Sequence, residues 1–213
     1  CATEVEMSPS STMFTVKHHG VELGRLTLKM IGRHNVQNAL AAIAVAQEVG
    51  VSFDVASRAL ESFEGISRRF EVKGEVDSVT VVDDYGHHPA EIRATLEAAR
   101  QAYGRRLVVA FQPHRYSRTR DLLDDFSTAF NASDVLVLGD IYAAGEEPIA
   151  GVDASCVAQA VRSHGHHEVH VAGSVDRVAE RLFELAEPGD IVLTLGAGDV
   201  WRAGDSLLSR LHD

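Results

Sequence analysis

Two polar segments of this sequence each follow an apolar segment that is typical of a buried strand. Residues 83–88 carry two carboxylates, a phenol and two imidazoles, and they follow the apolar residues 79–82. Pro89 comes next and suits the first turn of a helix, where its missing N–H needs no partner. Residues 112–120, which follow the apolar residues 107–111, carry a histidine and three arginines. Because open α/β sheets bind ligands where strands end, these segments predict a site that binds an anion and handles protons.

Arg115 and Arg118 lie three residues apart, close to the expected start of a helix over residues 119–131. A guanidinium group binds a carboxylate or a phosphate through two parallel hydrogen bonds. Together with Arg120, the pair would oppose the positive end of the helix dipole, so these cations indicate an anion bound at the helix start. A solvated helix start is the alternative.

The histidines raise the question of a metal site. His87 and His88 are adjacent, and adjacent side chains point in different directions, which favours one histidine that orients or polarises a substrate over a metal-binding pair. Four further histidines lie around a loop and an outer strand, where we expect them to be exposed rather than bound to a metal. They are His164, His166, His167 and His170.

Three other motifs have two interpretations each. Gly196 and Gly198 follow a predicted strand, and they either let a phosphate approach the backbone or make a tight turn. The two arginines at 68–69 follow a linker and are either exposed to solvent or placed to reach a nucleotide phosphate. Asn35 and Asn38 are one turn apart, and they either cap a helix or read the edge of an adenine ring.

Composition excludes several classes of protein. The 213 residues carry a formal net charge of −11, which argues against a face that binds nucleic acid, because such a face needs concentrated lysine and arginine. No apolar run approaches the ~18 residues of a membrane span, and no signal segment opens the chain. Cys1 and Cys156 are too distant in sequence to suggest a disulfide framework. We therefore expect a cytoplasmic protein with no nucleic-acid or membrane partner.

The N-terminal third of the chain is expected to form a hairpin and two helices. Residues 12–17 and 21–29 alternate apolar and polar side chains, which predicts a hairpin without a partner strand upstream. Asn35 is expected to cap the alanine-rich helix that follows. A second helix is expected over residues 53–62, and residues 64–67 are expected to be a linker.

Beyond the linker, strands and helices alternate along the sequence. Strands are predicted over residues 70–76, 79–82, 107–111, 135–138, 169–171 and 191–195. Helices are predicted over residues 89–102, 119–131, 155–163, 175–186 and 200–211. This order predicts an α/β fold, a Rossmann-like and mostly parallel sheet with helices on both faces.

Several segments resemble the motifs of the Mur ligases, in the order and spacing of that family. They are Gly-Arg-His-Asn-Val-Gln-Asn-Ala at 32–39, Arg-Arg-Phe at 68–70, Val-Asp-Asp-Tyr-Gly-His-His-Pro at 82–89, Phe-Gln-Pro-His-Arg-Tyr-Ser-Arg-Thr-Arg at 111–120, Tyr-Ala-Ala-Gly-Glu at 142–146 and Leu-Gly-Ala-Gly at 195–198. Mur ligases have a UDP-binding domain, a central ATPase domain and a C-terminal Rossmann-like domain. The resemblance implies that residues 1–67 are the C-terminal remnant of the central ATP-binding domain. Residues 68–213 would be the amino-acid-binding domain.

The motifs are most similar to the branch of the family that joins L-alanine to UDP-N-acetylmuramate in peptidoglycan synthesis. The implied reaction uses ATP and Mg²⁺ to activate the UDP-N-acetylmuramate carboxylate as an acyl phosphate. The amino group of L-alanine then attacks it, which gives an amide, ADP and phosphate. The phosphate-binding loop and most metal ligands would lie in an upstream part that this sequence lacks, so the chain is expected to be inactive alone. The resemblance is compatible with a homodimer.

The nucleotide contacts of the family fall on four residues of this sequence. Asn35 and Asn38 match asparagines near the adenine and the catalytic centre. Arg69 matches an arginine that contacts the ATP phosphates, and Asp84 matches an aspartate that holds the nucleotide. The resemblance therefore implies ATP-binding and catalytic roles for these four residues.

The amino-acid contacts of the family fall on the two polar segments. Tyr85 and His87 lie where the family contacts the amino-acid end of its substrate, and His87 also counts among the implied catalytic residues. Arg115 and Arg118 match the pair that binds the alanine carboxylate, with His114 beside them. A pair that fixes the carboxylate leaves the amine free to be aimed, and such positioning supplies much of a catalysed rate.

Two other functions stay open. A ligase of the same family that adds a whole peptide in cell-wall recycling would share most motifs, although an arginine pair sized for one alanine argues against a tripeptide. A dinucleotide-binding oxidoreductase domain would use Gly196 and Gly198. The glycine pattern of that class is incomplete here, and its loop follows the last strand rather than the first.

Overall fold

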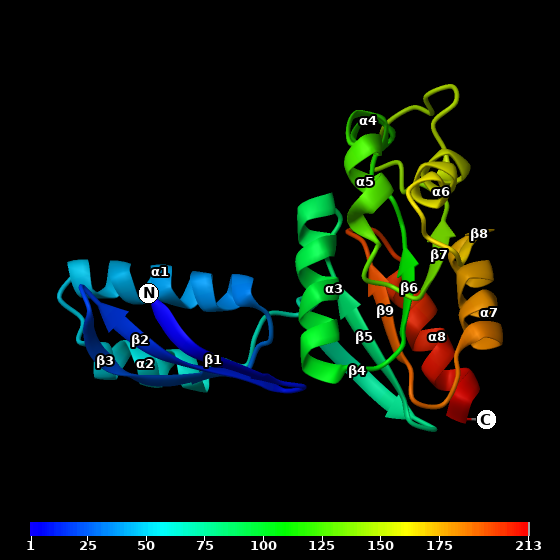
Figure 1. Cartoon of the computed structure of the whole chain (residues 1–213). Helices are drawn as coiled ribbons and strands as arrows, with labels where there is room; N and C mark the ends of the chain where they lie inside the picture. Colours follow the sequence, from blue (N-terminus) through cyan, green and yellow to red (C-terminus); the bar gives the residue numbers. More distant parts are fainter. Residues whose placement is uncertain (213) are drawn as a thin grey trace. The chain divides into compact units, whose positions relative to one another are not determined.

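In the computed structural model, which describes residues 1–212, the chain divides into two compact units (Figure 1). The first unit comprises residues 1–66 with residues 97–104. The second comprises residues 67–96 and the described chain from residue 105 onward. Among the described residues, no helix combines the length and the apolar character needed to cross a bilayer.

The first unit contains an antiparallel sheet and two helices. Its strands are β1 (Ala2–Ser8), β2 (Ser11–His18) and β3 (Val21–Leu28), in the order β1-β2-β3. The predicted hairpin is confirmed as β2 and β3, but the prediction that it has no upstream partner is wrong, because β1 pairs with β2. All side chains of β1 are half-buried or exposed, so this strand lacks the apolar pattern that marks a core strand.

The helices of the first unit are α1 (Arg33–Glu48) and α2 (Phe53–Ser62). Asn35 does not cap α1, because Gly32 occupies the cap position with φ of 100°. Asn35 instead lies inside the first turn, where its side-chain amide donates a hydrogen bond to the main-chain oxygen of Ile31 at 2.8 Å. Glycine suits this cap because a side chain is strained at a positive φ.

The second unit contains a mixed sheet of six strands among the described residues. They are β4 (Glu71–Val76), β5 (Val79–Asp84), β6 (Leu107–Phe111), β7 (Val135–Gly139), β8 (Val169–Gly173) and β9 (Ile191–Leu195). The order is β4-β5-β9-β6-β7-β8, and every neighbouring pair is parallel except β4 with β5. The last strand therefore lies between the first two parallel strands. The predicted mostly parallel sheet is confirmed.

Helices cover both faces of this sheet, as predicted (Figure 1). They are α3 (Pro89–Tyr103), α4 (Tyr116–Asp121), α5 (Leu123–Ala129), α6 (Ala154–Ser163), α7 (Val175–Leu185) and α8 (Trp201–His212). Alternate residues of β6 reach opposite faces. Val108 and Ala110 join the core formed with α7 and α8, whereas the Phe111 ring packs 5.5 Å from Phe126 and 5.0 Å from Phe130.

Two local predictions for this unit are wrong. The helix expected over residues 119–131 is two short helices, because the backbone of Leu122 leaves the helical region between them. His166 is buried, although we expected the histidines of this region to be exposed. Its Nε2 lies 3.0 Å from the Ser133 hydroxyl and its Nδ1 accepts the N–H of Glu168, so the ring is a satisfied part of the core.

Phe111 ends β6 and thereby anchors the segment that carries His114 and Arg115. Because its ring is fully buried between two other rings, we expect Phe111→Ala to lower the free energy of unfolding by about 3–5 kcal/mol. Phe183 on α7 is 45% exposed, so Phe183→Ala is a matched control that should change stability by less than about 0.5 kcal/mol. Urea denaturation of both variants measures the difference, and equal losses would contradict this account of the core.

Candidate active site

The predicted polar segments meet at one edge of the second unit. The parallel register pairs Asp84 of β5 with Leu195 of β9, Leu195 with Phe111 of β6, and Phe111 with Leu138 of β7. The carboxyl ends of four strands are thus level. The segments that follow them lie at the position where open α/β sheets bind ligands.

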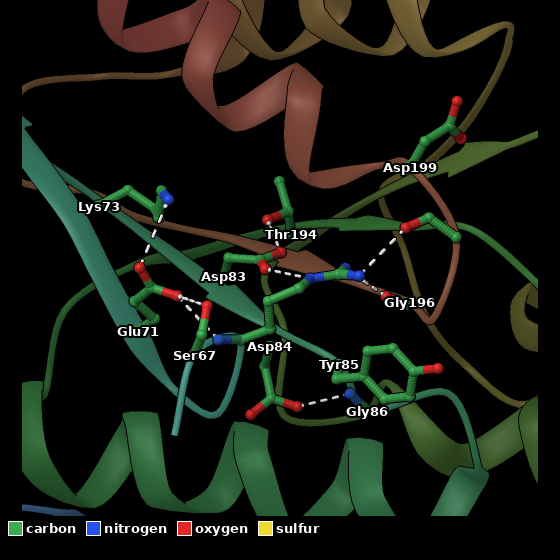
Figure 2. A network of polar contacts seen from close by, with 12 residues as sticks. Ser67, Glu71, Lys73, Asp83, Asp84, Tyr85, Gly86, Thr194, Gly196 and Asp199 are labelled. Atoms are coloured by element: carbon green, nitrogen blue, oxygen red, sulfur yellow. Dashed lines mark hydrogen bonds and ion pairs between the residues drawn. The ribbon is translucent and has the colours of Figure 1, made fainter. Parts of the chain in front are cut away.

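Arg68 joins two of these strand ends through a buried ion pair. Its Nε donates to Asp83 at 2.8 Å, and the Asp83 side chain is only 2% exposed. Its two terminal nitrogens donate to the main-chain oxygens of Gly196 at 2.7 Å and Gly198 at 3.2 Å. Figure 2 shows this network, in which Thr194 also donates to Asp83 at 2.7 Å. Arg68 is therefore only partly exposed, and its contacts are internal.

The segment around Gly196 and Gly198 is a packed turn. Its two carbonyl groups face Arg68, and the N–H of Gly196 donates to the main-chain oxygen of Asp84 at 3.1 Å. A side chain at Gly198 would lie 2.3 Å from Gln112 Oε1. A phosphate-binding loop presents N–H groups to its ligand, so this geometry favours the tight-turn interpretation.

Asp84 is buried, and both of its carboxylate oxygens accept main-chain N–H groups. Oδ1 accepts from Gly86 at 2.7 Å and Oδ2 accepts from Phe70 at 2.9 Å. Burial raises the pKa of Asp84, and the two N–H donors and the nearby Arg69 charge oppose that shift only in part. Asp84 thus fixes the backbone at the end of β5.

Glu91, which the sequence analysis did not single out, holds the start of α3. One carboxylate oxygen accepts the main-chain N–H groups of His87 at 3.0 Å and His88 at 3.1 Å, and the other lies 3.7 Å from Arg69. Burial would raise the pKa of Glu91, but the two N–H donors and the charges of His87 and Arg69 outweigh burial and lower it. Glu91 is the third residue of the helix that Pro89 begins, a position from which a glutamate can reach the N–H groups at the helix start, so the predicted helix start could have pointed to it.

Four rings from three loops form a continuous row. The Tyr85 and His87 ring centres are 5.5 Å apart, His87 and His114 are 5.6 Å apart, and His114 stacks on Tyr142 at 5.5 Å. The guanidinium of Arg68 also lies over the Tyr85 ring, 5.1 Å from its centre. The structure thus brings together the predicted residues Tyr85, His87 and His114, and it adds Tyr142.

Arg118 sets the tautomer of the neutral His114 ring. The Arg118 Nη1 lies 3.1 Å from His114 Nδ1 and 3.2 Å from the His114 main-chain oxygen. Arginine can only donate, so His114 Nδ1 accepts, and a neutral His114 carries its proton on Nε2. Burial lowers the pKa of His114, and the charges of Arg118, His87 and Arg115 lower it further.

Arg115 and Arg118 contact different groups within the protein. Arg115 caps α4, and its Nη1 lies 3.9 Å from Glu146, whereas Arg118 lies in the last turn of that short helix. The anion at the start of α4 is the Glu146 carboxylate, which accepts both the N–H and the hydroxyl of Ser117. An anion therefore lies at this helix start, as predicted from the sequence, but it is a carboxylate of the protein itself. The Arg115 side chain is 49% exposed and can still receive an external carboxylate.

Two of the predicted residues lie in the first unit. Asn38 is exposed on α1, and its side-chain amide lies 3.4 Å from Asn35 Oδ1.

Within residues 1–212, no group of three or more His, Cys, Asp and Glu side chains is placed to hold a metal ion.

The second unit is an α/β domain with polar side chains at the carboxyl edge of its sheet, and comparison with known proteins names the family of the chain. Residues 68–198 match the family described as Mur ligase, glutamate ligase domain, so the chain belongs to the Mur ligases. The chain is 53% identical over 211 residues to a UDP-N-acetylmuramate–L-alanine ligase from Geobacter sp. (strain M21). That match covers 99% of this chain and 46% of the relative.

Solved structures agree with this assignment. A UDP-N-acetylmuramate–alanine ligase from Thermotoga maritima superposes with a TM-score of 0.80 at 27% identity, over 99% of this chain and 45% of that one. A murein peptide ligase from Psychrobacter arcticus gives a TM-score of 0.66 at 28% identity, over 100% of this chain and 44% of that one. The chain spans about half the length of the relatives it matches.

The contact between Arg118 and His114 predicts a measurable pKa change. We expect His114 to titrate below the usual histidine value of about 6.5, with its neutral form protonated on Nε2. Arg118→Gln removes a nearby positive charge and should raise the pKa of His114. Arg120 is exposed and pairs with Asp121, so Arg120→Gln should leave the His114 pKa unchanged.

Nitrogen-detected NMR of histidine-labelled protein across a pH series reports both the tautomer and the pKa. If Arg118→Gln left the His114 pKa unchanged, or if the neutral ring were protonated on Nδ1, the result would contradict the geometry.

Proposed function

We propose that this chain is the amino-acid-binding end of an ATP-dependent ligase that joins L-alanine to UDP-N-acetylmuramate in peptidoglycan synthesis. The identity of 53% with an L-alanine ligase over nearly the whole chain supports the choice of substrate. The observation that carries the proposal is the half-exposed Arg115 guanidinium, three residues before Arg118, at the edge of the sheet where His87 and His114 meet.

In this proposal the two arginines bind the L-alanine carboxylate. Arg115 has only a 3.9 Å contact to Glu146, so a substrate carboxylate can form shorter and stronger hydrogen bonds with it. The row of rings then borders the amino acid, and its nitrogen points toward an acyl phosphate of UDP-N-acetylmuramate. Holding the nucleophile in this way supplies rate through positioning.

The roles of the remaining residues follow the family and stay proposals. Asn35 and Asn38 would lie near the adenine, and Arg69 and Asp84 would act on the nucleotide side. Residues 1–67 would be the end of the ATP-binding domain and 68–213 the amino-acid-binding domain. Because ATP supplies the energy, we place the reaction in the cytoplasm. When bound, Mg²⁺ would neutralise the phosphates, with ligands from outside the described residues.

The two alternative functions are less well supported. A peptide-adding ligase is favoured by the similarity to the Psychrobacter structure, which has a lower TM-score than the alanine ligase from Thermotoga. A dinucleotide-binding oxidoreductase would need N–H groups at Gly196 and Gly198 turned toward a phosphate. The carbonyl groups of both residues are turned to Arg68 instead.

The test uses a full-length ligase. This is a protein in which the present chain is joined to the remaining part of a relative, the part that the chain does not cover. Arg115→Ala should raise the KM for L-alanine through loss of a charged hydrogen bond worth roughly 1.5–3 kcal/mol, which is about tenfold or more. The KM for ATP should stay unchanged. Arg120→Ala, which removes a neighbouring exposed arginine, is the matched control.

Steady-state kinetics with each substrate varied in turn measures these constants. An unchanged alanine KM in Arg115→Ala would refute the carboxylate-binding role. A wild-type enzyme that accepts a tripeptide better than L-alanine would favour the recycling ligase instead.

A further inference from the structure

The two ring nitrogens of His87 have different surroundings. Nδ1 lies 3.1 Å from the main-chain oxygen of Tyr85 and 3.6 Å from the Glu91 carboxylate. A carbonyl and a carboxylate oxygen can only accept, so Nδ1 carries the proton in the neutral ring. Nε2 then keeps its lone pair, and no group among residues 1–212 forms a hydrogen bond with it.

The neighbouring histidines present the opposite arrangement. His114 Nδ1 accepts from Arg118, and His88 Nδ1 accepts the N–H of Ala90 at 3.3 Å. Their neutral rings are therefore protonated on Nε2 and can only donate there. Of the three histidines at this edge, His87 is the one whose Nε2 can accept a proton.

Glu91 is well placed to hold His87 in this state. Its carboxylate is fixed by the N–H groups of His87 and His88, and Arg69 lies 3.7 Å from its second oxygen. An ionised carboxylate 3.6 Å from Nδ1 favours the Nδ1–H form of the neutral ring, which leaves the lone pair on Nε2.

We propose that His87 is the proton acceptor for the ammonium group of the incoming amino acid, and that Glu91 is the positioning residue that sets its tautomer. This inference rests on the proposed function. The ammonium gives one proton to His87 Nε2 and becomes a neutral amine. The nitrogen lone pair then forms the C–N bond, the C–O bond to phosphate breaks, and the leaving phosphate takes that electron pair and the second amine proton.

Charged and titratable side chains lie around the His87 ring. Tyr85 lies on one side, His114 on the other, and Glu91 connects the ring to Arg69. Burial and the charge of the nearby Arg118 lower the pKa of His114.

Hydroxylamine gives a direct test in the full-length ligase. Hydroxylamine is uncharged near neutral pH, so it attacks an acyl phosphate without a protein base, whereas L-alanine must first lose a proton. His87→Gln should lower the rate of L-alanine ligation by about 10²–10⁴-fold. The rate of ATP-dependent hydroxamate formation from UDP-N-acetylmuramate should stay near that of the wild type. His88→Gln, an adjacent exposed imidazole, is the matched control for both rates.

The outcomes separate the two proposals. If the wild type forms no ATP-dependent hydroxamate, the proposed function fails. If the wild type forms hydroxamate but His87→Gln loses hydroxamate and alanine ligation equally, or keeps alanine ligation, the proton-acceptor role of His87 fails and the proposed function stands.

Glu91→Gln tests the positioning role, because it removes the charge and keeps an oxygen for the two N–H donors. We expect a loss of alanine ligation without loss of hydroxamate formation, and a kcat that recovers as pH rises. Glu91→Asp should restore part of the rate. In a His87→Gln background, Glu91→Gln should cause no further loss. Additive losses in the double variant would show that Glu91 does not act through His87.

Discussion

The candidate site depends on one buried ion pair, between Arg68 and Asp83. A carboxylate that is 2% exposed costs several kcal/mol in free energy unless it is paired and hydrogen-bonded. Arg68 meets that need and uses its remaining N–H groups on the carbonyls of Gly196 and Gly198. The same guanidinium lies over Tyr85. By pairing with the buried Asp83 carboxylate, Arg68 therefore joins β5 to the segment after β9, and it also contacts Tyr85, the first ring of the row.

At the same edge of the sheet, different hydrogen-bond partners give the neighbouring histidines different tautomers. Arg118 makes His114 a donor at Nε2, and the carbonyl of Tyr85 with Glu91 makes His87 an acceptor there. The two rings are 5.6 Å apart, yet their outer nitrogens have opposite roles. Such a pair can distinguish an ammonium group, which can only donate, from polar groups that accept hydrogen bonds, because only the acceptor ring can receive its proton.

Much of this fold could be predicted from the sequence, because β6 and β7 are continuous apolar runs, β5 and β9 are mostly apolar, and all four strands are buried. The sequence could not predict contacts between residues that are distant in the chain. Arg68 and Arg69 are equivalent as letters, and only contacts with Gly196 and Gly198, far away in the chain, make Arg68 the internal one. The half-buried β1 and the Glu146 carboxylate at α4 likewise depend on partners distant in sequence. The resemblance named the residues around the ring row, but it could not give their tautomers.

A crystal structure of the full-length ligase with L-alanine bound tests the central claim most directly. The account predicts the alanine carboxylate on Arg115 and Arg118, with the nitrogen within hydrogen-bond distance of His87 Nε2. An ammonium cannot accept a hydrogen bond, so it should not approach the Nε2–H of His114. A carboxylate bound elsewhere, or a nitrogen turned away from His87, would contradict the account.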